Sequence, residues 1–89
     1  RIEWNLLSRA RVMDFIAEFS SIQDIGRFIQ MLREHGITVS DLQMNRKDRT
    51  QNDLIGVMFT IKLEKPIPHA KLLEMFSGFD GIKFVEEIL

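Results

Sequence analysis

Hydrophobic and polar residues alternate along residues 11–19, where every second side chain is apolar. A period of two predicts a half-buried strand with Met13, Phe15, Ala17 and Phe19 on its inner face. Over residues 21–35 the apolar positions recur every three or four residues, which predicts an amphipathic helix. Ser21 is expected to cap its start, and Gly36 to follow its end in a left-handed conformation.

A hairpin is predicted next. Residues 37–45 and 54–63 each alternate and predict two strands, joined by a polar, turn-forming run over residues 46–53. In the first of these strands the alternation changes phase after Val39, and a β-bulge near Ser40 would account for the change.

A second helix and a last strand complete the pattern. Pro68 is expected in the first turn of a helix that ends at Gly78, and residues 81–88 predict a strand whose two faces the pattern leaves open. The order strand, helix, strand, strand, helix, strand predicts a ferredoxin-like α+β fold. In this fold two helices lie on one face of a four-stranded antiparallel sheet. We expect residues 10–89 to form this domain, and residues 1–9 to be an arm or linker from an upstream region.

Composition narrows the function. The chain has 89 residues and a net charge of −1, which argues against a dedicated nucleic-acid-binding protein. It has no cysteine, so it offers no thiolate zinc site, and its two histidines are far apart in sequence. No phosphate-binding loop or nucleophile motif is present. We therefore expect a non-enzymatic domain without a cofactor or a metal site.

The outward face of the predicted sheet is the main candidate for an interface. It would present an unusual number of apolar side chains to water, which favours contact with a protein partner or a second copy. The edge strand, residues 37–45, is a second route to a homodimer. The alternatives to an interface are scattered apolar residues on the surface, or docking of the Trp4 arm across the face. The apolar residues of this predicted interface are Val12, Ile16, Leu54 and Met58, together with Trp4.

Acidic residues on the same face have two interpretations. Asp14 and Glu18 are expected to pair with a base on a neighbouring strand such as Lys62. Loose cation binding by Asp14, Glu18 or Glu86 is the weaker alternative.

Two segments resemble the ACT domain, the βαββαβ module of amino-acid-responsive regulators. They are REHGITVSDLQM at residues 33–44 and GIKFVEEI at residues 81–88, and the resemblance extends over residues 11–88. It implies a ligand site at the first strand–helix turn, formed by Ser20, Ser21, Gln23 and Asp24. The turn itself, FSSIQDIG at residues 19–26, lacks the proline of the family's Asp-x-Pro-Gly-like turn, and Gly26 falls inside the helical pattern. Amino-acid sensing is therefore the alternative function here.

Residues 1–19, RIEWNLLSRARVMDFIAEF, resemble the stretch that follows the last membrane helix in the MgtC/SapB family of bacterial inner-membrane proteins. This resemblance implies a domain on the cytoplasmic side of the inner membrane, attached to a membrane region. It also implies a role in magnesium limitation or virulence. The function that we expect is a regulatory or protein-interaction domain.

Overall fold

The computed structural model describes residues 11–45 and 53–89. Every predicted element is present within one or two residues of its expected bounds. The predicted hairpin tip lies almost entirely outside the described residues, and so do the arm and Trp4. The elements are β1 (Val12–Phe19), α2 (Ile22–Glu34), β2 (Ile37–Asn45), β3 (Ile55–Leu63), α3 (His69–Ser77) and β4 (Ile82–Ile88).

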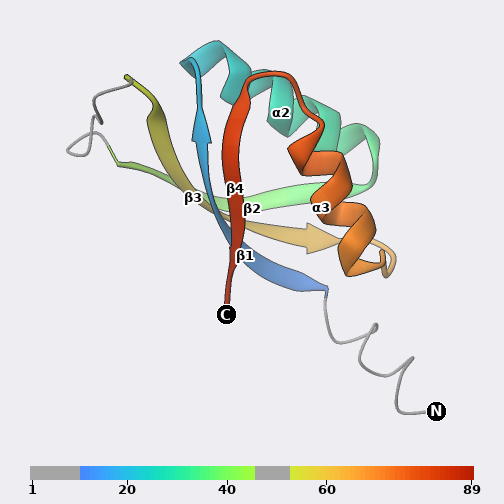
Figure 1. Ribbon diagram of the computed structural model, residues 1–89. Coiled ribbons are helices and arrows are strands. Elements are labelled where there is room, and N and C mark those ends of the chain that lie inside the picture. Colours follow the sequence, from blue (N-terminus) through green and yellow to red (C-terminus); the bar gives the residue numbers. More distant parts are fainter. Residues whose placement is uncertain (1–10, 46–52) are drawn as a thin grey trace.

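The four strands form one antiparallel sheet in the order β2-β3-β1-β4. The first strand of the described fold is therefore central, and β2 and β4 form the two edges. Both helices lie on the same side of the sheet (Figure 1), with α2 packed against β1 and β2 and α3 against β4. This is the predicted ferredoxin-like α+β arrangement, and the expected edge position of residues 37–45 is confirmed.

The core lies between the helices and the sheet and is rich in phenylalanine. The ring of Phe28, on α2, lies 5.3 to 5.6 Å from four other rings, contributed by β1, β3, α3 and the segment after α3, all in edge-on contact. Edge-to-face pairs at this separation stabilise a core beyond the effect of area burial alone. The four rings belong to Phe19, Phe59, Phe76 and Phe79.

Two backbone irregularities follow the sequence pattern. Gly36 has a φ of 75° after the end of α2, and its N–H donates to the carbonyl oxygen of Arg33 at 3.1 Å. In β2, Val39 is opposite Ile61 and Asp41 is opposite Thr60, so Ser40 is the extra residue of a bulge. Both predictions are confirmed. Helix α3 begins at His69, with Pro68 as its N-cap, one residue later than expected.

A second irregularity, in β4, determines which residues of the last strand face the core. Phe19 is opposite Ile82, whereas the preceding residue, Glu18, is opposite Phe84, so Lys83 is an extra residue in β4. The register shift reverses the phase of the strand. As a result Ile82 and Val85 both pack against the core, while Phe84 points to the other side of the sheet.

Candidate functional site

The face of the sheet that points away from the helices is called the open face below. It is built from every second residue of β1 and from the residues opposite them on the neighbouring strands. The alternation of buried and exposed side chains along β1 and β3 shows that their inner positions fill the core. The outward positions of β1 are Val12, Asp14, Ile16 and Glu18.

Apolar side chains gather around Ile16 on this face. Met58 lies directly opposite Ile16 on β3. On β4, Phe84 and Ile88 lie opposite Glu18 and Asp14, which makes both of them diagonal neighbours of Ile16. Met58 is 48% exposed and Phe84 is 44% exposed, although water is a poor environment for side chains of this size. The apolar cluster of the open face is Val12, Ile16, Met58, Phe84 and Ile88.

Three of the predicted interface residues, Val12, Ile16 and Met58, are members of this cluster. Leu54 is half-buried and lies before the first residue of β3, beyond the last paired row of β1 and β3. Phe84 and Ile88 did not emerge from the sequence, because the extra residue Lys83 hides the phase of β4.

The open face is acidic as well as apolar. Its paired rows contain four carboxylates, one on β2, two on β1 and one on β4. Among the described residues of these rows, Lys62 is the single base, so four negative charges against one positive charge leave a net charge of −3. The four carboxylates are those of Asp14, Glu18, Asp41 and Glu86.

A shallow depression of about 270 Å³ lies on the open face over β2, β3 and β1. Two of the residues that line it are hydrogen-bonded to each other: the hydroxyl of Thr60 donates to Oδ1 of Asp14 at 2.5 Å. The expected pairing of Asp14 with Lys62 is wrong, because the register places Lys62 opposite Val12 and Thr60 opposite Asp14. Glu18 is likewise opposite Gly56 and Phe84, and has no base directly across from it.

The carboxylates on β1 and β4 lie on one face, since Glu86 is opposite Ile16, between Asp14 and Glu18. Within residues 11–45 and 53–89, however, no group of three or more His, Cys, Asp or Glu side chains is arranged to hold a metal ion. Cation binding by Asp14, Glu18 or Glu86 stays a prediction.

The two adjacent glutamates near the C-terminal end point to opposite sides of the sheet. Glu86 is exposed on the open face, whereas Glu87 points toward the helices and pairs with the imidazole of His69 at the start of α3. Glu87 is only 17% exposed, so the contact links α3 to the edge strand β4.

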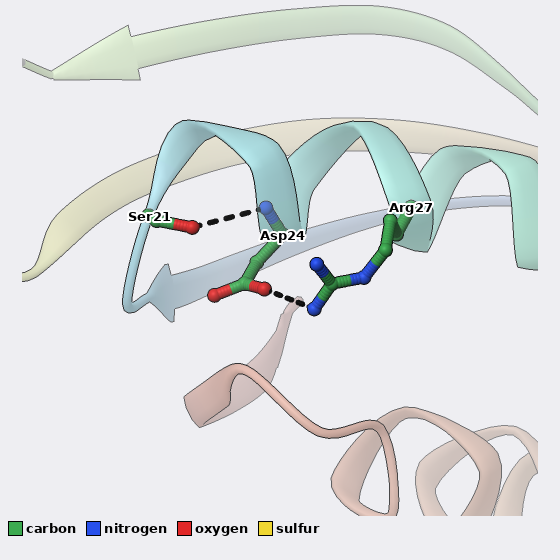
Figure 2. A network of polar contacts seen from close by, with 3 residues as sticks. All are labelled: Ser21, Asp24 and Arg27. Carbon is green, nitrogen blue, oxygen red and sulfur yellow. Dashed lines mark hydrogen bonds and ion pairs between the residues drawn. The ribbon is translucent and has the colours of Figure 1, made fainter.

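The predicted ligand-binding turn between β1 and α2 has a structural function of its own (Figure 2). The hydroxyl of Ser21 accepts a hydrogen bond from the backbone N–H of Asp24 at 3.2 Å, which caps the helix as predicted. The carboxylate of Asp24 pairs with the guanidinium of Arg27 one turn further on. Asp24 is only 7% exposed.

Asp24 also lies directly over Gly81, the residue that precedes β4. A Cβ atom at position 81 would lie 2.6 Å from Cγ of Asp24, and Gly81 has a φ of 113°. The carbonyl oxygen of Gly81 in turn accepts a hydrogen bond from the N–H of Ser20 at 2.9 Å. The start of α2 and the start of β4 are thus held together by Asp24, Gly81 and Ser20.

These contacts bear on the candidate ligand residues in different ways. Ser21 and Asp24 already have partners within the fold, whereas Gln23 and the side chain of Ser20 are exposed. The structure brings the four residues to one turn, and amino-acid binding by them stays a prediction.

Comparison of the chain with models of protein families, with characterised proteins and with solved structures finds no significant match. In the part of the chain that the structure describes, neither helix is long and apolar enough to cross a membrane.

Proposed function

We propose that this chain is a non-enzymatic protein-interaction domain with a regulatory role, and that its open face is the binding surface. The observation that carries the proposal is the apolar cluster. An antiparallel sheet with one face in water normally presents polar side chains there. Here five apolar side chains of three neighbouring strands form one group on the open face. Both helices lie on the other side of the sheet (Figure 1).

The composition of the cluster supports a protein as the ligand. Aromatic and methionine side chains are enriched in the buried centres of protein interfaces, with a polar rim around them. Met58 lies on the central strand β3, opposite Ile16, whereas Phe84 lies on the edge strand β4, diagonal to Ile16. Glu18 and Glu86 of the open face are neighbours of Phe84. Phe84 is the side chain that we expect to contribute most to binding, because large, well-buried aromatic groups dominate interface energetics.

The setting of the domain is proposed from the resemblance to the MgtC/SapB family. On this proposal the domain is part of a larger membrane protein and faces the cytoplasm at the bacterial inner membrane. Its partner would then act in the response to magnesium limitation or in virulence. Ser21 and Asp24, two of the candidate ligand-binding residues, already have partners within the fold. The amino-acid sensor is therefore the weaker alternative.

Site-specific photo-crosslinking tests the proposal. A photoreactive phenylalanine analogue is placed at Phe84, at Met58 or, as a control, at Ile22. Ile22 is 54% exposed and lies on α2, away from the open face. The protein is irradiated in an extract of the cells from which it comes, and adducts are identified by mass spectrometry.

We expect the same protein adduct from positions 84 and 58, its loss when Ile16→Asn is added, and its absence from position 22. Identical adducts from all three positions, or none from positions 84 and 58, would overturn the proposal. An amide NMR titration with amino acids is the complementary measurement, because localised shifts over residues 20–26 would favour the sensor alternative.

A further inference from the structure

The charge of the open face restricts what covers it. If two copies met through this face, the contact would bring together two surfaces that each carry four carboxylates and one lysine in their paired rows. Like charges placed opposite one another across an interface disfavour association. The face therefore suits a partner that combines apolar side chains with positive charge.

Residues 1–9 of the same chain have this chemistry. They contain four large apolar residues in nine positions, and two arginines against one glutamate give them a net charge of +1. The apolar residues are Ile2, Trp4, Leu6 and Leu7. Their charge is opposite in sign to that of the open face, and their apolar content matches the apolar cluster.

The segment is also attached at a suitable place. It joins β1 at Arg11, whose carbonyl oxygen accepts a hydrogen bond from the N–H of Leu63 at 2.7 Å, next to the Val12 end of the open face. Nine extended residues span up to about 30 Å, whereas the open face extends for about 20 Å along β1, from Val12 to Glu18. A tether of this length gives the segment an effective concentration on the order of millimolar at the face.

We propose that residues 1–9 fold back over the open face, with Trp4 against the apolar cluster and the arginines beside the carboxylates. The segment then competes with the external partner and sets the threshold for its binding. This regulatory meaning rests on the proposed function, because it requires the open face to be the binding surface. The intramolecular contact itself can be measured without the partner.

Trp4 provides the reporter. It is the single tryptophan of the chain, and there is no tyrosine, so the intrinsic fluorescence of the protein comes from this one side chain. The emission maximum of the full chain and its quenching by acrylamide are compared with those of a free peptide of residues 1–9. We expect the chain to emit at shorter wavelength and to be quenched less than the peptide, at every protein concentration.

Matched variants locate the contact. Phe84→Ser is expected to move the emission towards that of the free peptide, whereas Ile22→Ser, at a comparably exposed apolar position on α2, is expected to leave it unchanged. Arg9→Glu should have the same effect as Phe84→Ser, and Lys71→Glu, an equal charge change at an exposed position on α3, should have none. Arg9→Glu alters no residue of the described fold, so it tests the contact even if Phe84→Ser unfolds the protein.

The inference is overturned if the chain and the peptide emit alike, or if neither Phe84→Ser nor Arg9→Glu changes the emission. A shift that grows with protein concentration also overturns it, in favour of a second copy. The two proposals fail separately. If Trp4 emits as it does in the free peptide while position 84 crosslinks to a specific partner, only the proposal that residues 1–9 fold back is refuted. If the emission of Trp4 shows that it is docked, and position 84 crosslinks to residues 1–9 but to no other protein, only the proposed interaction function is refuted.

Discussion

Replacement of Gly81 by alanine is expected to destabilise the fold because two separate effects act at this position. The backbone of Gly81 has a φ of 113°, a conformation that is strained for any residue with a Cβ atom. The new Cβ would also lie 2.6 Å from Cγ and 2.9 Å from Cβ of Asp24, distances that require the buried aspartate to move. Asp24 cannot move without disturbing its pairing with Arg27 at the start of α2.

The size of the effect can be worked from these observations. Backbone strain of this kind costs about 1–3 kcal/mol. Displacement of the buried carboxylate from its partners adds roughly 1 kcal/mol, the typical value of a hydrogen bond lost inside a protein. We expect Gly81→Ala to lower the free energy of unfolding by about 2–4 kcal/mol, which for a domain of this size is a Tm decrease of roughly 10–25 °C.

Gly26→Ala is the matched control, because it adds the same Cβ atom at a position where we expect alanine to increase the stability of the fold. Gly26 lies within α2, and nothing lies within 4 Å of a Cβ atom built there. Alanine in place of glycine inside a helix stabilises it by about 0.5–1 kcal/mol. The two glycine-to-alanine changes should therefore shift stability in opposite directions.

Urea denaturation of both variants, followed by circular dichroism at 222 nm on the helical signal, measures these differences. A second pair, Asp24→Ala with and without Gly81→Ala, separates the collision from the backbone strain. The cost of Gly81→Ala should be smaller in the Asp24→Ala background, since the carboxylate is gone. An equal cost in both backgrounds, or a neutral Gly81→Ala, would refute the reasoning.

Three further predictions concern the helices and the core. Ser21→Ala should cost about 1 kcal/mol of unfolding free energy through loss of the α2 cap, whereas Ser20→Ala, at the exposed neighbouring position, should change it by less than about 0.5 kcal/mol in the same urea assay. Phe28→Leu should cost about 1–3 kcal/mol, because it removes one partner from four edge-on ring pairs; a cost no larger than that of Ile22→Leu on the surface would contradict this. His69→Gln should cost less than about 1 kcal/mol, since the imidazole that pairs with Glu87 is more than half exposed; calorimetry that shows a larger loss would mean that the pair holds α3 in place.

The fold could be predicted from the sequence because its signals are local. The period of two in β1, the helical period with a serine cap and a following glycine in α2, and the phase change at Ser40 each depend on residues close together in the chain. Each was confirmed because the tertiary structure uses these segments in the conformation that their own pattern favours.

The open face was only partly predictable, since its composition depends on strand register. Sequence alone identified Val12, Ile16 and Met58, but not which residues of β4 lie beside them. The extra residue Lys83 sets the phase of that strand, and no local signal marks it. The same limit explains the wrong partner for Asp14, because a shift of register by two residues exchanges Thr60 for Lys62.

The central place of β1 also has a consequence for how the chain folds. The β2–β3 hairpin forms from neighbouring segments. In contrast, β1 pairs with β3 across 36 to 50 positions, from Phe19–Ile55 to Val12–Lys62, and with β4 across 63 to 74 positions, from Phe19–Ile82 to Asp14–Ile88. Such distant pairings require large loops to close before they yield any stabilisation, which slows folding and makes the transition state depend on both ends of the domain. A nascent chain that ends before β4 would therefore leave β1 with one side unpaired, and the stable domain would form only after Ile88 has been synthesised.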